Sequence, residues 1–99
     1  MAGYFIGNYN IINPELYNEY VSKAMPLTMK HGGKALVAGP GTVTLEGDPG
    51  AITVILEFAS KEAALGWYND PAYQAIIPMR QEATEGGTAQ IASEFVMPG

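Results

Sequence analysis

The sequence contains no cysteine, and its 99 residues include a single histidine and a single tryptophan. Without cysteine, the chain can form neither a disulfide framework, nor a thiolate nucleophile, nor a thiolate metal site. This composition permits a reducing compartment, and we expect a cytoplasmic protein. A lone histidine with no spaced cluster of carboxylates also argues against a metal or haem site.

Long hydrophobic runs are missing as well. Nowhere do about 18 apolar residues follow one another, as a transmembrane helix would require. The N-terminal stretch MAGYFIGNYN lacks the basic segment and the apolar run of a signal peptide. We therefore expect a soluble protein with no membrane partner.

Positive charge is scarce, because 5 Lys and Arg residues stand against 10 Asp and Glu residues and give a net charge of −5. The resulting field repels phosphate backbones, so nucleic acid is not an expected partner. Charged residues make up 15% of the chain, below the usual share of about 25%. A chain of this length forms one domain, residues 1–99, and its apolar surface predicts a homodimer.

The first third of the chain predicts a strand and a helix. Side chains alternate over residues 4–12, as in a strand. A helix over residues 14–31 follows, since Asn13 can cap it and Pro14 suits its first position. We expect this helix to bend at Pro26 and to end at Gly32-Gly33.

Residues 34–58 predict a pair of strands joined by a Gly- and Pro-rich connection. The first strand begins near Lys34, passes an irregular Gly-Pro-Gly stretch and continues briefly over residues 42–46. A turn at residues 47–50 leads to the second strand, residues 51–58. One side of that strand is wholly apolar and should pack against helices. It consists of Ile52, Val54, Leu56 and Phe58.

Two helical segments and a last strand fill the remainder. Ser60 can cap a helix that ends at Asn69-Asp70-Pro71, because the residue before a proline is steered out of the helical conformation. Asp70 can cap a second helix from Pro71 to about residue 85, bent near Pro78. Gly86-Gly87 should end this helix, and residues 88–96 form a fourth strand.

This order of elements predicts an α+β fold of the ferredoxin-like type, with the second helix broken at Asp70-Pro71. Right-handed crossovers give a four-stranded antiparallel sheet with the helices on one face. The other face stays open, and a homodimer could cover it. On this open face we place Ile6, Asn8, Asn10, Thr53, Ile55, Glu57, Gln90, Ala92 and Glu94.

Several stretches carry a family resemblance: GYFIGNYNIINPELYNEYV, HGGKALVAG followed by LEGD, and ILEFASKEAALGWYNDPAYQAIIPMRQEA before the closing strand. Together they resemble domain of unknown function 1330, within the dimeric α+β barrel superfamily. The resemblance covers nearly the whole chain. It implies a ferredoxin-like subunit and a dimer whose two sheets close a barrel, and it implies no reaction. Similar superfamily members include quinol monooxygenases, muconolactone isomerases, chlorite dismutases and stress-responsive barrel proteins, a likeness at the level of fold.

A ligand pocket is expected between the sheet and the helices, where Gly7 and Ser93 would leave room among larger neighbours. Aromatic side chains could form its walls, and for these the alternative is a place in the core behind the helix break. The candidate ligand-binding residues are Tyr9, Trp67, Tyr68, Tyr73 and Ser93.

His31 and Arg80 are the candidate catalytic residues. Histidine is the side chain that ordinarily titrates near neutrality, so His31 could act as a general base, or it could interact as a cation with the end of its helix. Arg80 is the single arginine, on an apolar helix face, and could hold a carboxylate or an enolate. Alternatively, it could pair with a carboxylate and brace the fold, the possible partners being Glu57, Glu94 and Asp70.

Other chemistry has little support. Glu57 and Glu94 could raise each other's pKa on the open face, or simply face solvent. No serine has His and Asp partners at a recognisable spacing, and GPGTVTLEGDPG lacks the pattern of a phosphate loop. We therefore expect no cofactor and no metal.

Two functions remain. In the first, a homodimer binds a small aromatic or enolisable, possibly anionic metabolite between sheet and helices. In the second, a cofactor-independent enzyme of the monooxygenase or isomerase kind uses His31 as base and Arg80 as anion stabiliser.

Overall fold

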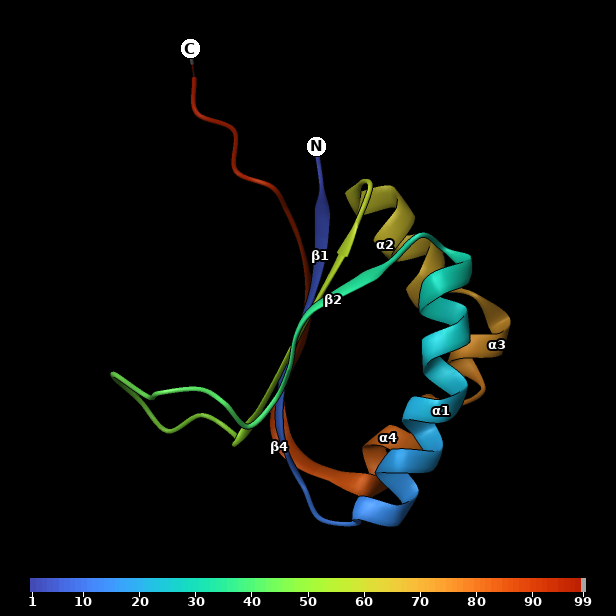
Figure 1. Ribbon diagram of the computed structural model, residues 1–99, viewed down its shortest axis with the longest axis vertical. Coiled ribbons are helices and arrows are strands. Elements are labelled where there is room, and N and C mark those ends of the chain that lie inside the picture. The colour runs from blue at the N-terminus through green and yellow to red at the C-terminus, as the bar shows by residue number, and fades with distance from the viewer. Residues whose placement is uncertain (99) are drawn as a thin grey trace.

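A computed structural model describes residues 1–98 and shows a sheet with helices on one face (Figure 1). The strands are β1 (Gly3–Ile11), β2 (Lys34–Gly39), β3 (Ile52–Phe58) and β4 (Thr84–Ser93). The helices are α1 (Pro14–Lys30), α2 (Lys61–Tyr68), α3 (Pro71–Gln74) and α4 (Ile77–Ala83). The sheet is antiparallel with the order β2-β3-β1-β4, which confirms the predicted ferredoxin-like arrangement.

Local capping explains where the helices begin. The side chain of Asn13 accepts a hydrogen bond from the Leu16 amide at 3.2 Å, and Ser60 accepts one from the Ala63 amide at 3.0 Å. Asp70 accepts one from the Ala72 amide at 2.9 Å, so the predicted break between α2 and α3 is confirmed. Pro26 lies inside α1.

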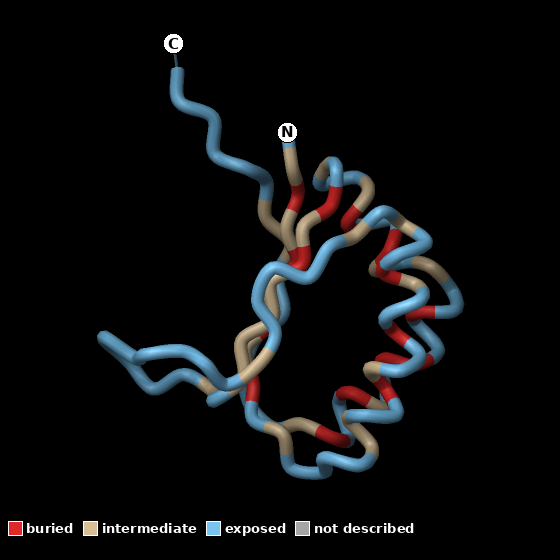
Figure 2. The backbone as a smooth tube through the Cα atoms, in the orientation of Figure 1, coloured by how far each residue is buried: buried red, intermediate tan, exposed pale blue. Residues whose placement is uncertain are grey.

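The core lies between the sheet and the helices, where Figure 2 shows buried positions on the strands and helices that face each other. Alternation along β1 and β3 turns Phe5, Leu56 and Phe58 inward. They pack with Trp67 and Tyr73, which are 1% and 0% exposed. The apolar side of β3 therefore meets the helices, as predicted.

Two segments extend from the sheet on the side away from the helices (Figure 1). One is the 40–51 loop, and the other is the C-terminal tail, residues 94–98. The predicted strand at residues 42–46 is wrong, because these residues make no ladder and belong to the irregular loop. The loop is instead attached at its end: Asn8 accepts a hydrogen bond from the Gly50 amide at 2.7 Å and donates to the Gly50 and Ile52 carbonyls at 3.1 Å.

The last helix and strand also differ from the prediction. The helix expected from Pro71 to about residue 85 is divided at residues 75–76 into α3 and α4, with Pro78 in the first turn of α4. Strand β4 begins at Thr84 and ends at Ser93, so the expected 88–96 strand is displaced. Gly86 and Gly87 do not end the helix; both have positive φ and lie where the β1–β4 register shifts. A Cβ at Gly87 would collide with the Asn8 carbonyl, so the glycine pair forms a bulge.

Within residues 1–98, no helix combines the length and the apolar character that a bilayer crossing requires.

Candidate functional site

Arg80 lies on the buried side of α4. Ile77 and Ala83, three residues before and after it, are buried on the same side of this short helix, and Arg80 itself is only 8% exposed. Its Nε–H group is buried and has no hydrogen-bond partner within residues 1–98. A buried donor without a partner has a desolvation cost, so this arginine needs an explanation beyond packing.

Tyr9, Tyr20 and Tyr73 lie near the Arg80 side chain. The hydroxyls of Tyr20 and Tyr73 lie 2.6 Å apart, and those of Tyr9 and Tyr17 lie 2.7 Å apart. Burial raises the pKa of Tyr9 and of Tyr20 above the ordinary value of 10.0. Burial also raises the pKa of Tyr73, although Tyr20 and Arg80 act in the opposite direction. Near neutral pH these phenols are uncharged hydrogen-bonding groups.

Among the described residues, no carboxylate forms an ion pair with Arg80, although Glu85 lines the same cavity. Burial lowers the pKa of Arg80, but interactions with Tyr73 and Tyr20 outweigh this effect and raise the pKa above its ordinary value, so the side chain stays cationic. Within residues 1–98, no salt bridge involves Arg80. The site is therefore a buried positive charge among neutral phenols, an arrangement typical of anion-binding sites.

The predicted carboxylate partners of Arg80 are engaged elsewhere. Glu57 accepts a hydrogen bond from the Tyr4 hydroxyl at 3.3 Å. Glu94 accepts one from the Ala2 amide at 2.7 Å. Asp70 binds His31. Of the two alternatives for Arg80, bracing the fold through an ion pair is therefore wrong for the described part of the chain.

A cavity of about 290 Å³ opens at Arg80. Its wall is formed by the end of α4 and the first half of β4, including the Gly86-Gly87 bulge. Because glycine has no side chain, the bulge contributes main-chain atoms to the wall. The lining residues are Tyr9, Arg80, Gln81, Thr84, Glu85, Gly86, Gly87, Thr88 and Ala89.

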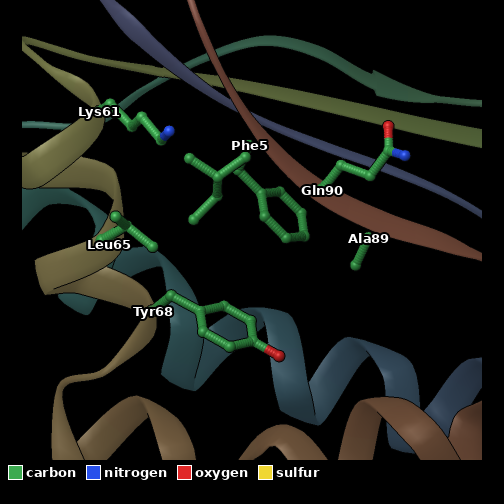
Figure 3. A pocket seen from close by; sticks show the side chains of 7 residues that line it. Phe5, Lys61, Leu65, Tyr68, Ala89 and Gln90 are labelled. Atoms are coloured by element: carbon green, nitrogen blue, oxygen red, sulfur yellow. The ribbon is translucent and has the colours of Figure 1, made fainter.

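A second cavity of about 330 Å³ lies further along β4, beneath α2. Figure 3 shows Lys61, Leu65 and Tyr68 of α2 on one side of it, and Phe5, Ala89 and Gln90 of the strands on the other. Ile91 completes the lining, which is mostly apolar. Ala89 lines both this cavity and the one at Arg80.

A smaller cavity of about 80 Å³ lies between α1 and the sheet, among core side chains such as Tyr20, Leu56 and Trp67. The Nε1–H group of Trp67 is buried without a partner within residues 1–98. Trp67 packs against Tyr73 and Phe5, with ring centroids 4.2 and 5.1 Å apart. Trp67 and Tyr73 thus pack in the core, and Trp67 also lines this small cavity.

His31 lies at the C-terminal end of α1, outside the three cavities. Its Nε2 atom is 2.8 Å from an Asp70 carboxylate oxygen, and Lys30 Nζ is 3.2 Å from the same oxygen. Hydrogen bonds to His31, to the Ala72 amide and to Lys30 lower the pKa of Asp70 to about 2. This cluster joins the end of α1 to the start of α3.

Residues 2–93 match the family model described as a domain of unknown function, DUF1330. The chain belongs to the DUF1330 family. No curated protein matches this chain in sequence.

Solved structures similar to this DUF1330 chain share its fold. A protein of unknown function from Rhodopseudomonas palustris is 19% identical, with 97% of this chain and 84% of that one aligned at a TM-score of 0.78. A dimeric ferredoxin-like protein of unknown function from Bacteroides fragilis is 13% identical, with coverage of 94% and 96% and a TM-score of 0.61. A dimeric ferredoxin-like protein of unknown function from Thermobifida fusca is 11% identical, with coverage of 95% and 92% and a TM-score of 0.61.

In this DUF1330 chain the predicted site residues do not form one constellation. Tyr9 and Arg80 line the same cavity, and Tyr68 lines the neighbouring one. Ser93 is exposed at the end of β4 and lines none of the three cavities. Gly7 leaves no empty space, because a Cβ there would meet the rings of Phe5 and Tyr9 at 3.1 and 3.3 Å.

Sequence reasoning missed the contribution of β4. Thr88, Ala89 and Ile91 line the cavities, but nothing in their residue types indicates a ligand site. The Gly86-Gly87 pair was the one available signal, and it also fits the end of a helix.

Proposed function

We propose that this DUF1330 protein binds a small anionic metabolite, aromatic or enolisable, with its negative charge at Arg80. The observation that carries the proposal is the Arg80 side chain, which is buried, lacks a carboxylate partner within residues 1–98 and lines a cavity. A carboxylate or enolate would supply the negative charge that the guanidinium lacks within residues 1–98. The Tyr9 ring would form a wall beside it.

The geometry favours binding over catalysis. The alternative, a cofactor-independent monooxygenase or isomerase, requires His31 to act as base on a molecule held at Arg80. His31 lies outside the cavity and has Asp70 as its partner at 2.8 Å. Near Arg80 the phenols of Tyr9, Tyr20 and Tyr73 have raised pKa values and are poor bases at neutral pH.

The proposed assembly is a cytoplasmic homodimer formed through the open sheet face. Two exposed apolar segments flank this face: Val43 and Leu45 in the 40–51 loop, and Phe95, Val96 and Met97 in the C-terminal tail (Figure 1). A second copy of the chain would cover apolar surface that water contacts in the isolated subunit. The similar proteins from Bacteroides fragilis and Thermobifida fusca are described as dimeric.

Isothermal titration calorimetry with benzoate and its neutral analogue benzyl alcohol tests the binding proposal. We expect the wild type to bind benzoate more tightly than benzyl alcohol, and Arg80→Met to weaken benzoate binding at least about tenfold, because a charge-assisted hydrogen bond is lost. Lys34→Met, which removes an exposed cation from β2, is the control and should bind benzoate as the wild type does. Equal benzoate affinity in the wild type and Arg80→Met would exclude the proposal.

A further inference from the structure

The two cavities beside β4 meet at one small residue. Ala89 lines both, and its cross-strand partner on β1 is Gly7, which has no side chain. The rings of Phe5 and Tyr9 lie on either side of Gly7; Phe5 lines the apolar cavity, Tyr9 lines the Arg80 cavity, and both also line the small cavity beneath α1. The Ala89 methyl group is therefore the β4 side chain at the junction of the two cavities.

The two ends of this space differ in chemistry. At one end lie Arg80, Glu85 and the backbone of the glycine bulge. At the other end Phe5, Leu65 and Ile91 present apolar surface, and the Tyr68 ring extends from α2 toward the Ala89 side (Figure 3). Leu65 is 39% exposed, although it is a large apolar residue. Ligand pockets are lined mostly by apolar side chains, and the hydrocarbon part of a ligand covers them.

We propose that the ligand is an elongated carboxylate whose head group binds Arg80 and whose aliphatic or aryl-alkyl body passes Ala89 into the apolar cavity. This inference rests on the proposed anion site and adds the class of molecule. A strand advances about 3.4 Å per residue, so the path from Thr88 to Ile91 spans about 10 Å. That distance suits a medium-length chain better than a compact anion.

The length of the ligand is tested with a series of linear carboxylates, namely acetate, butyrate, hexanoate and octanoate, each kept below its micelle-forming concentration. We expect the affinity of the wild type to increase about fourfold per added methylene group, the gain for transferring a methylene out of water. In Arg80→Met the whole series should bind at least about tenfold more weakly, because the head group loses its charged partner.

Ala89→Leu tests the junction. Ala89 is exposed in the subunit, so leucine should fit without disturbing the fold, but its side chain would close the passage. We expect octanoate affinity to fall at least about tenfold and by more than benzoate affinity does, since Ala89 also lines the Arg80 cavity. Ala72→Leu, at an exposed alanine on α3 outside the three cavities, is the matched control. Leu65→Ser, which removes apolar surface at the far end, should reproduce the octanoate loss and provides an independent second variant.

The outcomes separate this inference from the proposed function. If benzoate binding depends on Arg80 but octanoate binds no better than butyrate, the elongated ligand is excluded and the anion site stands. If octanoate binds equally well to Arg80→Met, the head group is not at Arg80 and the inference fails. If neither benzoate nor octanoate binds the wild type, the anion site itself is excluded.

Discussion

The Nε2 atom of His31 lies 2.8 Å from Asp70 Oδ2, and this contact connects the end of α1 with the residue that caps α3. The carboxylate is thus at once a helix cap and the partner of two basic side chains, His31 and Lys30. The sequence left two roles open for His31, a general base or a cation at the end of its helix, and the structure places it in a connection between two helices.

Acid stability should depend on Asp70. Its pKa is lowered from 3.8 to about 2, so its ionised form stabilises the folded state above pH 3.8, and this contribution is lost as the pH falls through about 2. Asp70→Asn retains a capping side chain but loses the charge. Urea unfolding across this acidic range should therefore show a shallower loss of stability for Asp70→Asn than for the wild type. Asp48→Asn, in the exposed 40–51 loop, should retain the wild-type profile; a profile for Asp70→Asn identical to wild type would contradict the assignment.

Alkaline stability should depend on the buried tyrosines. Burial raises the pKa of Tyr9 and Tyr20 above 10.0, so the neutral phenols stabilise the folded state below that pH, and this contribution is lost as the pH rises beyond it. Tyrosinate absorbance and circular dichroism measured together should show these phenols ionising only as the protein unfolds. Full tyrosine ionisation in a protein that keeps its folded spectrum would contradict the buried cluster.

Arg80→Met should increase the stability of the ligand-free protein. The wild-type side chain is a buried charge without a carboxylate partner in the described chain, and an apolar side chain of similar length removes that cost. We expect the free energy of unfolding to rise by about 1–3 kcal/mol in urea denaturation, with an unchanged m-value. A decrease of that size would instead show that the guanidinium stabilises the core.

Ile55→Glu should disrupt the homodimer. Ile55 lies at the centre of the open sheet face, paired with Ile6 on β1 and Val37 on β2, and a carboxylate there would be buried in a face-to-face dimer. Light scattering should show a dimer for the wild type and a folded monomer for Ile55→Glu. Met29→Glu, the same kind of change at an exposed position of α1, should remain dimeric. A monomeric wild type would exclude the assembly.

Asn8→Asp should loosen the 40–51 loop. The carboxylate can still accept from the Gly50 amide, but it cannot donate to the Gly50 and Ile52 carbonyls and would repel them. We expect a loss of about 1–3 kcal/mol in the free energy of unfolding, together with faster amide exchange at Gly50. Asn18→Asp, at an exposed position of α1, should leave both measurements unchanged. Slow exchange at Gly50 in Asn8→Asp would show that the loop is held by other contacts.

The sequence determined the features that depend on near neighbours in the chain. Asn13, Ser60 and Asp70 begin helices because each side chain bonds an amide two or three residues further on. Alternation along β3 decided which side of the strand meets the helices, since successive side chains point to opposite faces. The order of elements then left few possible topologies, and the ferredoxin-like one was among them.

Tertiary structure decided whatever depends on residues far apart in the sequence. Gly86-Gly87 became a bulge because Asn8, on another strand, approaches Gly87 too closely for a side chain, and no local signal separates this use from a helix end. His31 became part of a helix junction because α1 ends beside Asp70. Within residues 1–98 the charge of Arg80 has no ion-pair partner, because the packing of α4 placed Tyr20 and Tyr73 next to it. Residue types show that an arginine can bind an anion, but only the three-dimensional packing shows that no carboxylate of residues 1–98 forms an ion pair with it.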